Sequence, residues 1–273
     1  MAYTLSRISL YPVKSLRGIE LSETVVEARG LRFDRRWMLV DKAGRFLSQR
    51  EHSSLVLVDV SFDPKSPETM TWQAPGMEPI TFSCLPAENA SVVSVQIWRS
   101  TCDALDVGES PARWMQAYLG AFCRLVYMPD STRRTVNPQY TAGEGVVSFA
   151  DGYPCLLAGQ ASLDQLNERL GQTLSMRRFR PNFVVEGSTP HEEDGWKEIA
   201  MGAVPMKGVK PCDRCVVITI DPETAEASQE PLATLASYRK RDGKVWFGQN
   251  LIPLEEGVVR LGDTLVVQAT WKT

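Results

Sequence analysis

Short apolar runs, separated by turn residues, dominate the first third of the chain. Such runs cover residues 3–13, 21–28, 34–41, 46–50, 55–62, 69–73, 80–84 and 92–98. They are rich in β-branched and aromatic residues, and glycine, proline and polar residues separate them at the spacing of a small barrel or sandwich. This pattern predicts a β-rich fold and leaves little room for long helices.

The rest of the chain repeats this pattern with a few helices added. Further strand-like runs cover residues 123–128, 183–185, 246–251 and 261–267, and short strands are expected within 196–209. Helix start and stop signals predict helices over 110–120, 162–171 and 231–238. Because residues 129–145 are polar and carry two prolines, we place a boundary there and predict two closely associated halves, 1–128 and 129–273, in an α+β, β-rich fold.

Composition excludes several classes of function. The 273 residues carry a net charge of −3, so no basic excess attracts a nucleic-acid backbone. No apolar run reaches about 18 residues, so we expect no membrane span. The N-terminal residues lack the features of a targeting segment, which predicts a cytoplasmic location. With two histidines only, a histidine metal cage or a Ser–His–Asp triad is disfavoured.

Reactive groups gather at Cys212 and Cys215, a C-x-x-C pair with Lys210 and Arg214 beside it. Fixed positive charge favours the thiolate, which is the form that binds metal or attacks. The β-branched run 216–220 that follows predicts a buried strand, with the cysteines on a tight loop entering it. A C-x-x-C pair alone fits half a zinc site, a redox dithiol, an iron–sulfur corner or two inert thiols.

Several loops place cations or amides next to the ends of predicted strands. These loops are Lys14-Ser15, Arg35-Arg36, Arg180-Pro181-Asn182 and Asp213-Arg214. Arginine forks and lysine charges suit a phosphate. The chain contains neither a P-loop nor a G-x-G-x-x-G motif, so a phosphate site would need side chains that converge from separate loops. Each loop taken alone also fits an ordinary solvated surface charge.

Six ordered motifs together resemble a known family. They are Tyr-Pro-Val-Lys-Ser at 11–15, Asp-Arg-Arg-Trp at 34–37, Phe-Arg-Pro-Asn at 179–182, Cys-Asp-Arg-Cys at 212–215, Glu-Pro-Leu-Ala-Thr-Leu-Ala-Ser-Tyr-Arg at 230–239 and Phe-Gly-Gln-Asn at 247–250. In this order they resemble the MOSC-domain proteins of the amidoxime-reducing type. The resemblance implies an N-terminal MOSC-type β-barrel domain at 1–128, packed against a MOSC β-barrel domain at 129–273.

The resemblance also implies a molybdenum cofactor, a molybdopterin that supplies two sulfurs to the metal. The protein ligand would be Cys215, and Asp151 would lie beside the metal as a catalytic residue. The position of Cys215 before the predicted strand favours the same residue, because a strand would hold its sulfur rigidly. The pterin phosphate would be held by Lys14, Arg35 and Arg180. The other residues expected near the cofactor are Ser15, Gly152, Tyr153, Asn182, Asp213, Arg214 and Asn250.

The activity implied is the reduction of N-hydroxylated compounds such as amidoximes and hydroxylamino-purines. The sequence lacks the C-x4-C-x2-C spacing of a plant-type ferredoxin, so electrons are expected from a separate protein, such as a ferredoxin-like or flavin reductase protein. Three other functions stay open: sulfur transfer through a cysteine persulfide, cofactor carriage without turnover, and structural zinc binding. Zinc is disfavoured, because a closed site needs four ligands.

Overall fold

Strands form most of the regular structure in the computed structural model, which describes residues 3–141 and 145–271. The α-helices are α1 (Glu109–Leu119), α2 (Pro138–Thr141), α3 (Gln160–Leu170) and α4 (Leu232–Arg239). The 3-10 helices are η1 (Ser53–Leu57), η2 (Met176–Phe179), η3 (Glu192–Gly195) and η4 (Val216–Thr219). No helix of the described residues is long and apolar enough to cross a bilayer.

The largest sheet closes into a seven-stranded barrel, and short strands β2 and β16 attach to it. Its strands are β1 (Tyr3–Leu10), β2 (Ile19–Leu21), β12 (Cys155–Gly159), β13 (Phe183–Glu186), β14 (Trp196–Met201), β15 (Val204–Arg214), β16 (Lys240–Arg241), β17 (Lys244–Pro253) and β19 (Thr264–Thr270). The order is β12-β13-β1-β19-β14-β15-β17, and pairing of β12 with β17 closes the ring. Closure leaves the barrel strands without open edges.

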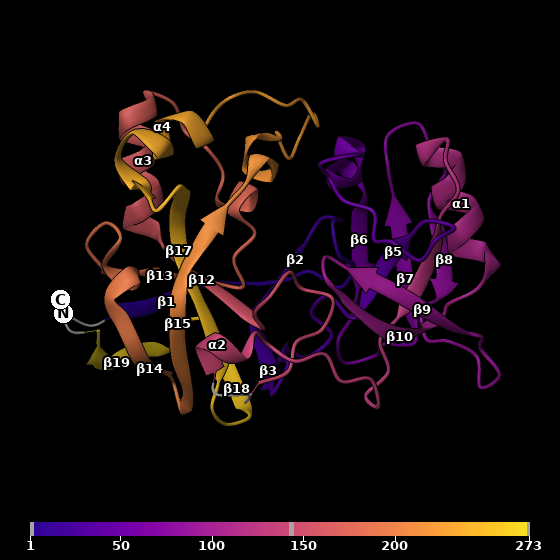
Figure 1. Ribbon diagram of the computed structural model, residues 1–273, viewed down its shortest axis with the longest axis horizontal. Helices are drawn as coiled ribbons and strands as arrows, with labels where there is room; N and C mark the ends of the chain where they lie inside the picture. Colours follow the sequence, from indigo (N-terminus) through magenta and orange to yellow (C-terminus); the bar gives the residue numbers. More distant parts are fainter. Residues whose placement is uncertain (1–2, 142–144, 272–273) are drawn as a thin grey trace.

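Three smaller sheets hold the remaining strands of the described residues, and two of them build the other half, which lies beside the barrel in Figure 1. One sheet joins β5 (Trp37–Val40), β11 (Arg124–Tyr127), β10 (Ser100–Asp106) and β9 (Val92–Ile97). A second joins β6 (Asp59–Phe62), β7 (Thr69–Gln73) and β8 (Ile80–Ser83), and a third joins β18 (Gly257–Arg260), β3 (Glu23–Glu27) and β4 (Gly30–Leu31).

One hydrophobic cluster runs through both halves. Trp37 and Trp72 of the smaller sheets and Trp196 of the barrel belong to it, and each is at most 2% exposed. Buried aromatic side chains of this size contribute strongly to stability through the apolar area that they remove from water. The two halves are therefore expected to hold a fixed relative position.

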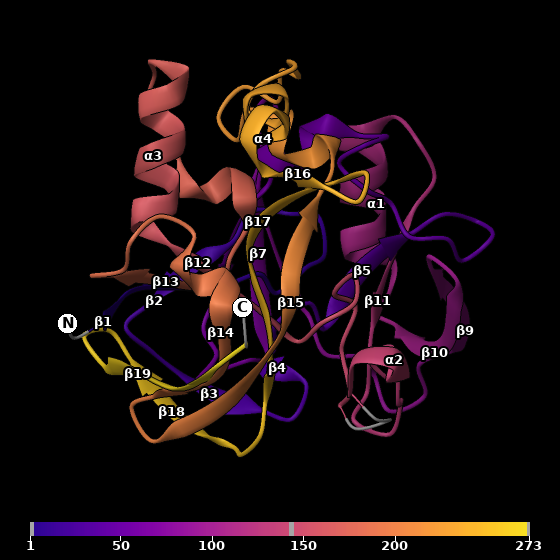
Figure 2. The ribbon, with the colours of Figure 1, turned by 60° about the vertical axis from the view of Figure 1, so that its left-hand side comes forward.

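The chain begins inside the barrel that its second half completes. Strand β1 pairs with β13 and β19, and β3 pairs with β18. Figure 1 shows β1 in indigo among the orange and yellow strands, and Figure 2 shows it beside β19. The boundary at 128/129 stays a prediction, since strand pairing alone does not define a domain.

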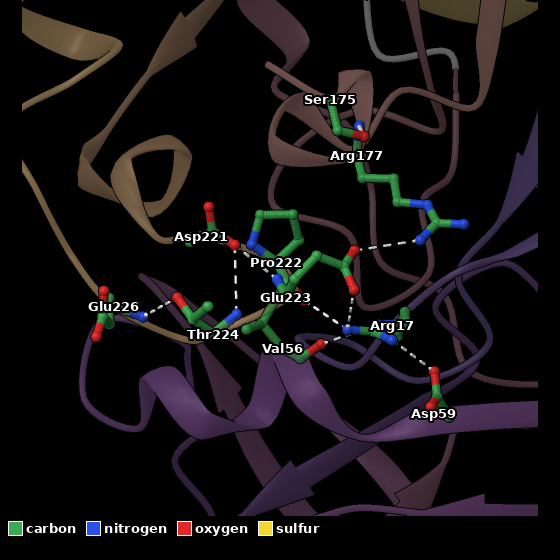
Figure 3. Close-up of polar contacts among 10 residues, drawn as sticks. All are labelled: Arg17, Val56, Asp59, Ser175, Arg177, Asp221, Pro222, Glu223, Thr224 and Glu226. Carbon is green, nitrogen blue, oxygen red and sulfur yellow. Dashed lines mark hydrogen bonds and ion pairs between the residues drawn. The ribbon is translucent and has the colours of Figure 1, made fainter. Parts of the chain in front are cut away.

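Arg17 ties the segment after β1 to both halves (Figure 3). Its guanidinium donates to Val56 O at 3.3 Å and to Asp59 at 2.9 Å, in the first half. It also donates to Pro222 O and pairs with Glu223 at 3.4 Å, in the second half. The five N–H donors of one guanidinium make such a multiple contact possible.

The predicted β-rich fold of two packed β domains is confirmed, and all three predicted helices are present as α1, α3 and α4. The predicted strand over 216–220 is wrong, because residues Val216–Thr219 form η4. Val216 is 53% exposed while Ile218 and Ile220 are buried, which suits one helical turn on the surface. Part of the polar loop 129–145 forms α2, and its residues 142–144 lie outside the described part of the chain.

Candidate active site

A cavity of about 180 Å³ lies where the two halves meet. Every residue predicted for the site lines it. From the first half come Lys14, Ser15 and Arg35, and from the second half come Asp151, Gly152, Tyr153, Arg180, Asn182, Asp213, Arg214, Cys215 and Asn250. The structure thus brings together loops that lie more than 200 residues apart in the sequence. Arg36 does not belong to it: its guanidinium donates to Met128 O and Asp130.

Strand β15, rather than a loop, carries the first cysteine. Cys212 lies within β15, and Cys215 follows the strand as the N-cap residue of η4. The pairing of β15 with β17 shifts register between Pro211 and Asp213, which accommodates a residue without an N–H donor. The argument that strand bonds hold Cys215 more rigidly than Cys212 is therefore wrong, because β15 ends at Arg214 and η4, not a strand, follows Cys215. Cys212 lies at the register shift and has no partner of its own in β17.

Each thiol of the pair accepts a hydrogen bond from an arginine. Arg214 Nη1 lies 3.1 Å from Cys212 Sγ, and Arg50 Nη2 lies 2.9 Å from Cys215 Sγ. Each of these two sulfurs therefore lies beside a fixed positive charge. Cys155 also lines the cavity, but burial raises the pKa of its thiol and makes it a poor ligand. Two of the three thiols in the cavity are thus suited to bind a soft metal.

Arg35 and Arg180 both lie over the ring of Tyr11, with their Cζ atoms 4.2 and 4.4 Å from its centroid. Arg35 is committed to protein acceptors, the carboxylate of Asp34, Asn182 Oδ1 at 3.1 Å and Arg180 O at 3.2 Å. Within the described residues the Arg180 guanidinium has no hydrogen bond or ion pair. Burial lowers the pKa of Arg180 to about 10, so it stays cationic at neutral pH. It is the cation most available to an anion.

Lys14 and Asp151 form an ion pair across the two halves. The Lys14 side chain is 9% exposed, and burial lowers its pKa although Asp151 opposes the shift. Desolvation would raise the pKa of Asp151, but the charge of Lys14 and the N–H groups of Lys14 and Trp98 outweigh it and hold that pKa well below its usual range. Asp151 is therefore ionised at neutral pH and serves as an acceptor.

We expect Asp151→Asn to lower the thermal unfolding midpoint at pH 7 by roughly 3 °C, because it leaves the buried Lys14 charge without its partner. A depressed carboxyl pKa stabilises the fold above the unfolded value of about 3.9 and loses that effect at lower pH. The difference between wild type and variant should thus be full at pH 7 and shrink below about pH 4. Thermal scans of both proteins from pH 3 to 7 measure this difference. A difference in unfolding midpoint that stays the same at every pH would contradict a stabilising Lys14–Asp151 ion pair.

Three of the eight non-glycine residues with a positive φ among the described residues line this cavity. Ser15, Arg35 and Arg180 have φ values of 74°, 49° and 54°, in the left-handed region that side chains with a Cβ seldom adopt. All three line the cavity. Such conformations persist where the surrounding structure enforces them, and they cluster at functional sites. The strained backbone at these three motif residues is consistent with a binding role.

Two buried amides hold the site in shape. Asn182 donates to Ser9 O at 3.2 Å, while its Oδ1 accepts from Arg35 and from Leu156 N, both at 3.1 Å. Asn250 donates to the carbonyls of Lys210 and Pro211, at 3.3 and 3.4 Å. Both asparagines thus orient neighbouring groups in the cavity wall.

The other predicted residues lie at the wall. Burial raises the pKa of Tyr153 to about 12, so its hydroxyl stays protonated. Asp213 pairs with Lys244 at 3.5 Å, and nothing within 4 Å would meet a Cβ on Gly152. All three predicted residues line the space that a ligand would occupy.

One segment of the wall was missed at the sequence level. Phe46, Ser48, Gln49 and Arg50 line the cavity from the first half. Gln49 Nε2 donates to Ser15 O at 2.6 Å and so supports the strained turn at Ser15. The only signal in the sequence was a polar triplet, Ser48 to Arg50, after an apolar pair, and that pattern equally fits a strand end.

The donor atoms of the cavity limit which metal it could hold. No group of three or more His, Cys, Asp or Glu side chains arranged for a metal occurs among the described residues. A metal held by Cys215 would therefore need most of its ligands from a cofactor. The buried Nε of Arg214 also has no partner in the described structure, and it lies in the cavity wall. A sulfur-rich, anionic cofactor fits both observations.

The fold and the site define a two-part β protein whose cavity combines thiol and cation groups. A model of the MOSC N-terminal beta barrel domain matches residues 2–121, and a model of the MOSC domain matches residues 144–266. The chain therefore belongs to the MOSC-domain family, in its amidoxime-reducing type with an N-terminal β-barrel domain.

Named relatives match along nearly the full chain. Mitochondrial amidoxime-reducing component 1 of Mus musculus is 31% identical, over 95% of this chain and 81% of its own length. Mitochondrial amidoxime reducing component 2 of Rattus norvegicus is 35% identical, over 95% and 82%. Component 1 of Homo sapiens is 31% identical, over 95% and 81%.

Proposed function

We propose that the protein is a molybdenum-cofactor-dependent oxidoreductase that reduces N-hydroxylated compounds such as amidoximes and hydroxylamino-purines. An amidoxime, R–C(=NOH)NH₂, takes up two electrons and two protons; the N–O bond breaks, and R–C(=NH)NH₂ and water form. The relatives named amidoxime-reducing components support this reaction. The single observation that carries the proposal is a cavity that joins the Cys215 thiol to the uncommitted Arg180 guanidinium.

The residues present fit a molybdopterin. Cys215 would anchor the metal, since a soft thiolate suits a sulfur-rich centre. Arg180 would bind the phosphate with its free fork, and Lys14 and Arg35 would add positive charge nearby. The cofactor, when bound, would supply the two-electron chemistry.

The chain's own residues would bind and orient the substrate. Asp151 is ionised, so we assign it the role of accepting hydrogen bonds from the amidoxime –NH₂ group. Lys14, whose pKa burial lowers, is better suited to give up a proton than a free lysine would be. Both groups lie in the cavity that Cys215 lines.

Electrons would come from a separate donor such as a ferredoxin-like or flavin reductase protein. The cytoplasmic location stays a prediction, and the relatives are named mitochondrial.

Metal and pterin analysis of the purified protein tests the cofactor, and benzamidoxime reduction with reduced methyl viologen tests the reaction. We expect close to one molybdenum and one pterin per chain, and formation of benzamidine. Protein that contains both but yields no benzamidine would favour a cofactor carrier. Zinc as the bound metal would overturn the proposal.

Sulfur transfer is a second candidate, because Cys212 places a second thiol with its own arginine in the same cavity. A persulfide on either cysteine would release thiocyanate on treatment with cyanide. Cyanide-labile sulfur in protein that lacks molybdenum would favour this function over reduction.

A further inference from the structure

Trp98 occupies a conformation that a tryptophan seldom adopts. It is one of the two residues that connect β9 to β10, and its φ is 54°. Glycine, asparagine and aspartate are the residues favoured in such hairpin turns. Trp98 is also 44% exposed and belongs to none of the hydrophobic clusters found in the described residues. Neither the turn nor the core accounts for a tryptophan here.

Three contacts hold the Trp98 ring at the mouth of the active-site cavity. Its Nε1 donates to Asp151 Oδ1 at 3.0 Å. The Phe46 ring meets it edge to face, with centroids 4.9 Å apart. The Arg50 guanidinium lies over it, with Cζ 4.6 Å from the centroid. Asp151, Phe46 and Arg50 all line the cavity, so the ring extends the cavity wall outward.

Arg50 joins this ring to the proposed metal ligand. One of its terminal nitrogens contacts Cys215 Sγ at 2.9 Å, and this is the one hydrogen bond that it makes within the described residues. A guanidinium has five N–H donors, so most remain for a bound molecule. The stack on Trp98 fixes the plane in which those donors point. The first half of the chain therefore contributes a flat ring and a hydrogen-bond donor beside Cys215.

We propose that Trp98 and Arg50 form the substrate-selecting wall of the site. This inference rests on the proposed function. The exposed part of the Trp98 ring stacks on a flat aromatic substituent of the substrate, and Arg50 donates to the oxygen of the N–O group. Trp98 thus contacts the substituent, which differs between substrates, whereas Arg50 contacts the N–O group, which every substrate shares. We assign Trp98 as a specificity-determining residue and Arg50 as a substrate-binding residue.

Variants of the holoprotein test this division with benzamidoxime and acetamidoxime, which differ in carrying a phenyl or a methyl group. We expect Trp98→Ala to raise the ratio of the benzamidoxime KM to the acetamidoxime KM by about tenfold, the usual loss for one stacked ring. Arg50→Met should raise both KM values by about tenfold and leave their ratio unchanged, because it removes a charged hydrogen bond to the shared oxygen.

Matched controls separate these effects from general damage. Trp271 is 41% exposed with Lys197 over its ring at 5.6 Å, and it does not line the cavity, so Trp271→Ala should leave the ratio unchanged. Arg45 is exposed and pairs with Asp41 in the same segment as Arg50, so Arg45→Met should leave both KM values unchanged. Molybdenum content should equal that of the wild type in all four variants. An unchanged ratio in Trp98→Ala overturns the role of Trp98, and unchanged KM values in Arg50→Met overturn that of Arg50.

Calorimetric binding of benzamidoxime to the oxidised holoprotein gives a readout without turnover. We expect Trp98→Ala to raise the Kd about tenfold and Trp271→Ala to leave it unchanged. If the wild type reduces neither amidoxime, the proposed function fails, while the calorimetric comparison still decides whether Trp98 binds an aromatic ligand. Equal Kd values in Trp98→Ala and the wild type would overturn the proposal that Trp98 binds the aromatic substituent.

Discussion

Cys215→Ser is expected to yield a folded protein without amidoxime reduction, with activity at least about 100-fold lower. A serine hydroxyl is a harder donor and stays protonated at neutral pH, so it cannot replace a thiolate on a soft metal. Cys212→Ser should retain molybdenum and most activity. Arg214 donates to Cys212 Sγ through one terminal nitrogen and to Phe179 O through the other, so it links this thiol to η2.

Molybdenum content and circular dichroism of both variants complete that experiment. The spectra should match the wild type, because Cys212 and Cys215 lie at the cavity rather than in the core. Equal loss of activity in the two variants would favour a dithiol or a shared metal site. Full activity in Cys215→Ser would remove the molybdenum proposal.

Arg180→Met should release the pterin during purification, with at least about tenfold weaker retention, because it removes the cation that has no protein partner. Arg180→Lys should weaken retention less, since a point charge replaces a two-pronged donor. The measurement is pterin and phosphate per chain after gel filtration. It does not depend on the electron donor or on the substrate.

Arg177→Lys is the control for these variants. Arg177 lies three residues earlier in η2, is half exposed and pairs with Glu223 at 3.3 Å, outside the cavity. It should retain the pterin as the wild type does. Pterin loss in Arg177→Lys to the same extent as in Arg180→Lys would show that retention does not depend specifically on the Arg180 fork.

The β-rich fold was predictable because turn residues punctuate short apolar runs, which is a local signal. The run 216–220 was predicted wrongly for the same reason. A β-branched sequence favours a strand locally, but here the exposed Val216 and the end of β15 place it in one 3-10 turn. Tertiary contacts therefore decided between two structures that the local sequence allows.

Most residues of the site could be predicted from their motifs, but the hydrogen-bond partners of each residue in the folded protein could not. The sequence gives no reason to rank Arg180 above Arg35 as an anion ligand. That difference comes from Asp34 and Asn182, which occupy the Arg35 guanidinium in the folded protein. Arg50 and Trp98 were missed because no motif marks them. Only the folded structure brings Trp98 against Asp151 and Arg50 against Cys215, across the two halves.

The pairing of β1 with β13 and β19 has a consequence for folding during synthesis on the ribosome. Tyr3 lies opposite Leu265 in that pairing, so the barrel cannot close until almost the whole chain has left the exit tunnel. Long-range pairings of this kind slow folding and leave strand edges exposed in the nascent chain. Two of the smaller sheets, whose strands all lie within residues 37–127, can form first. A chain shortened before β19 would therefore keep an open barrel edge and need a chaperone to stay free of aggregates.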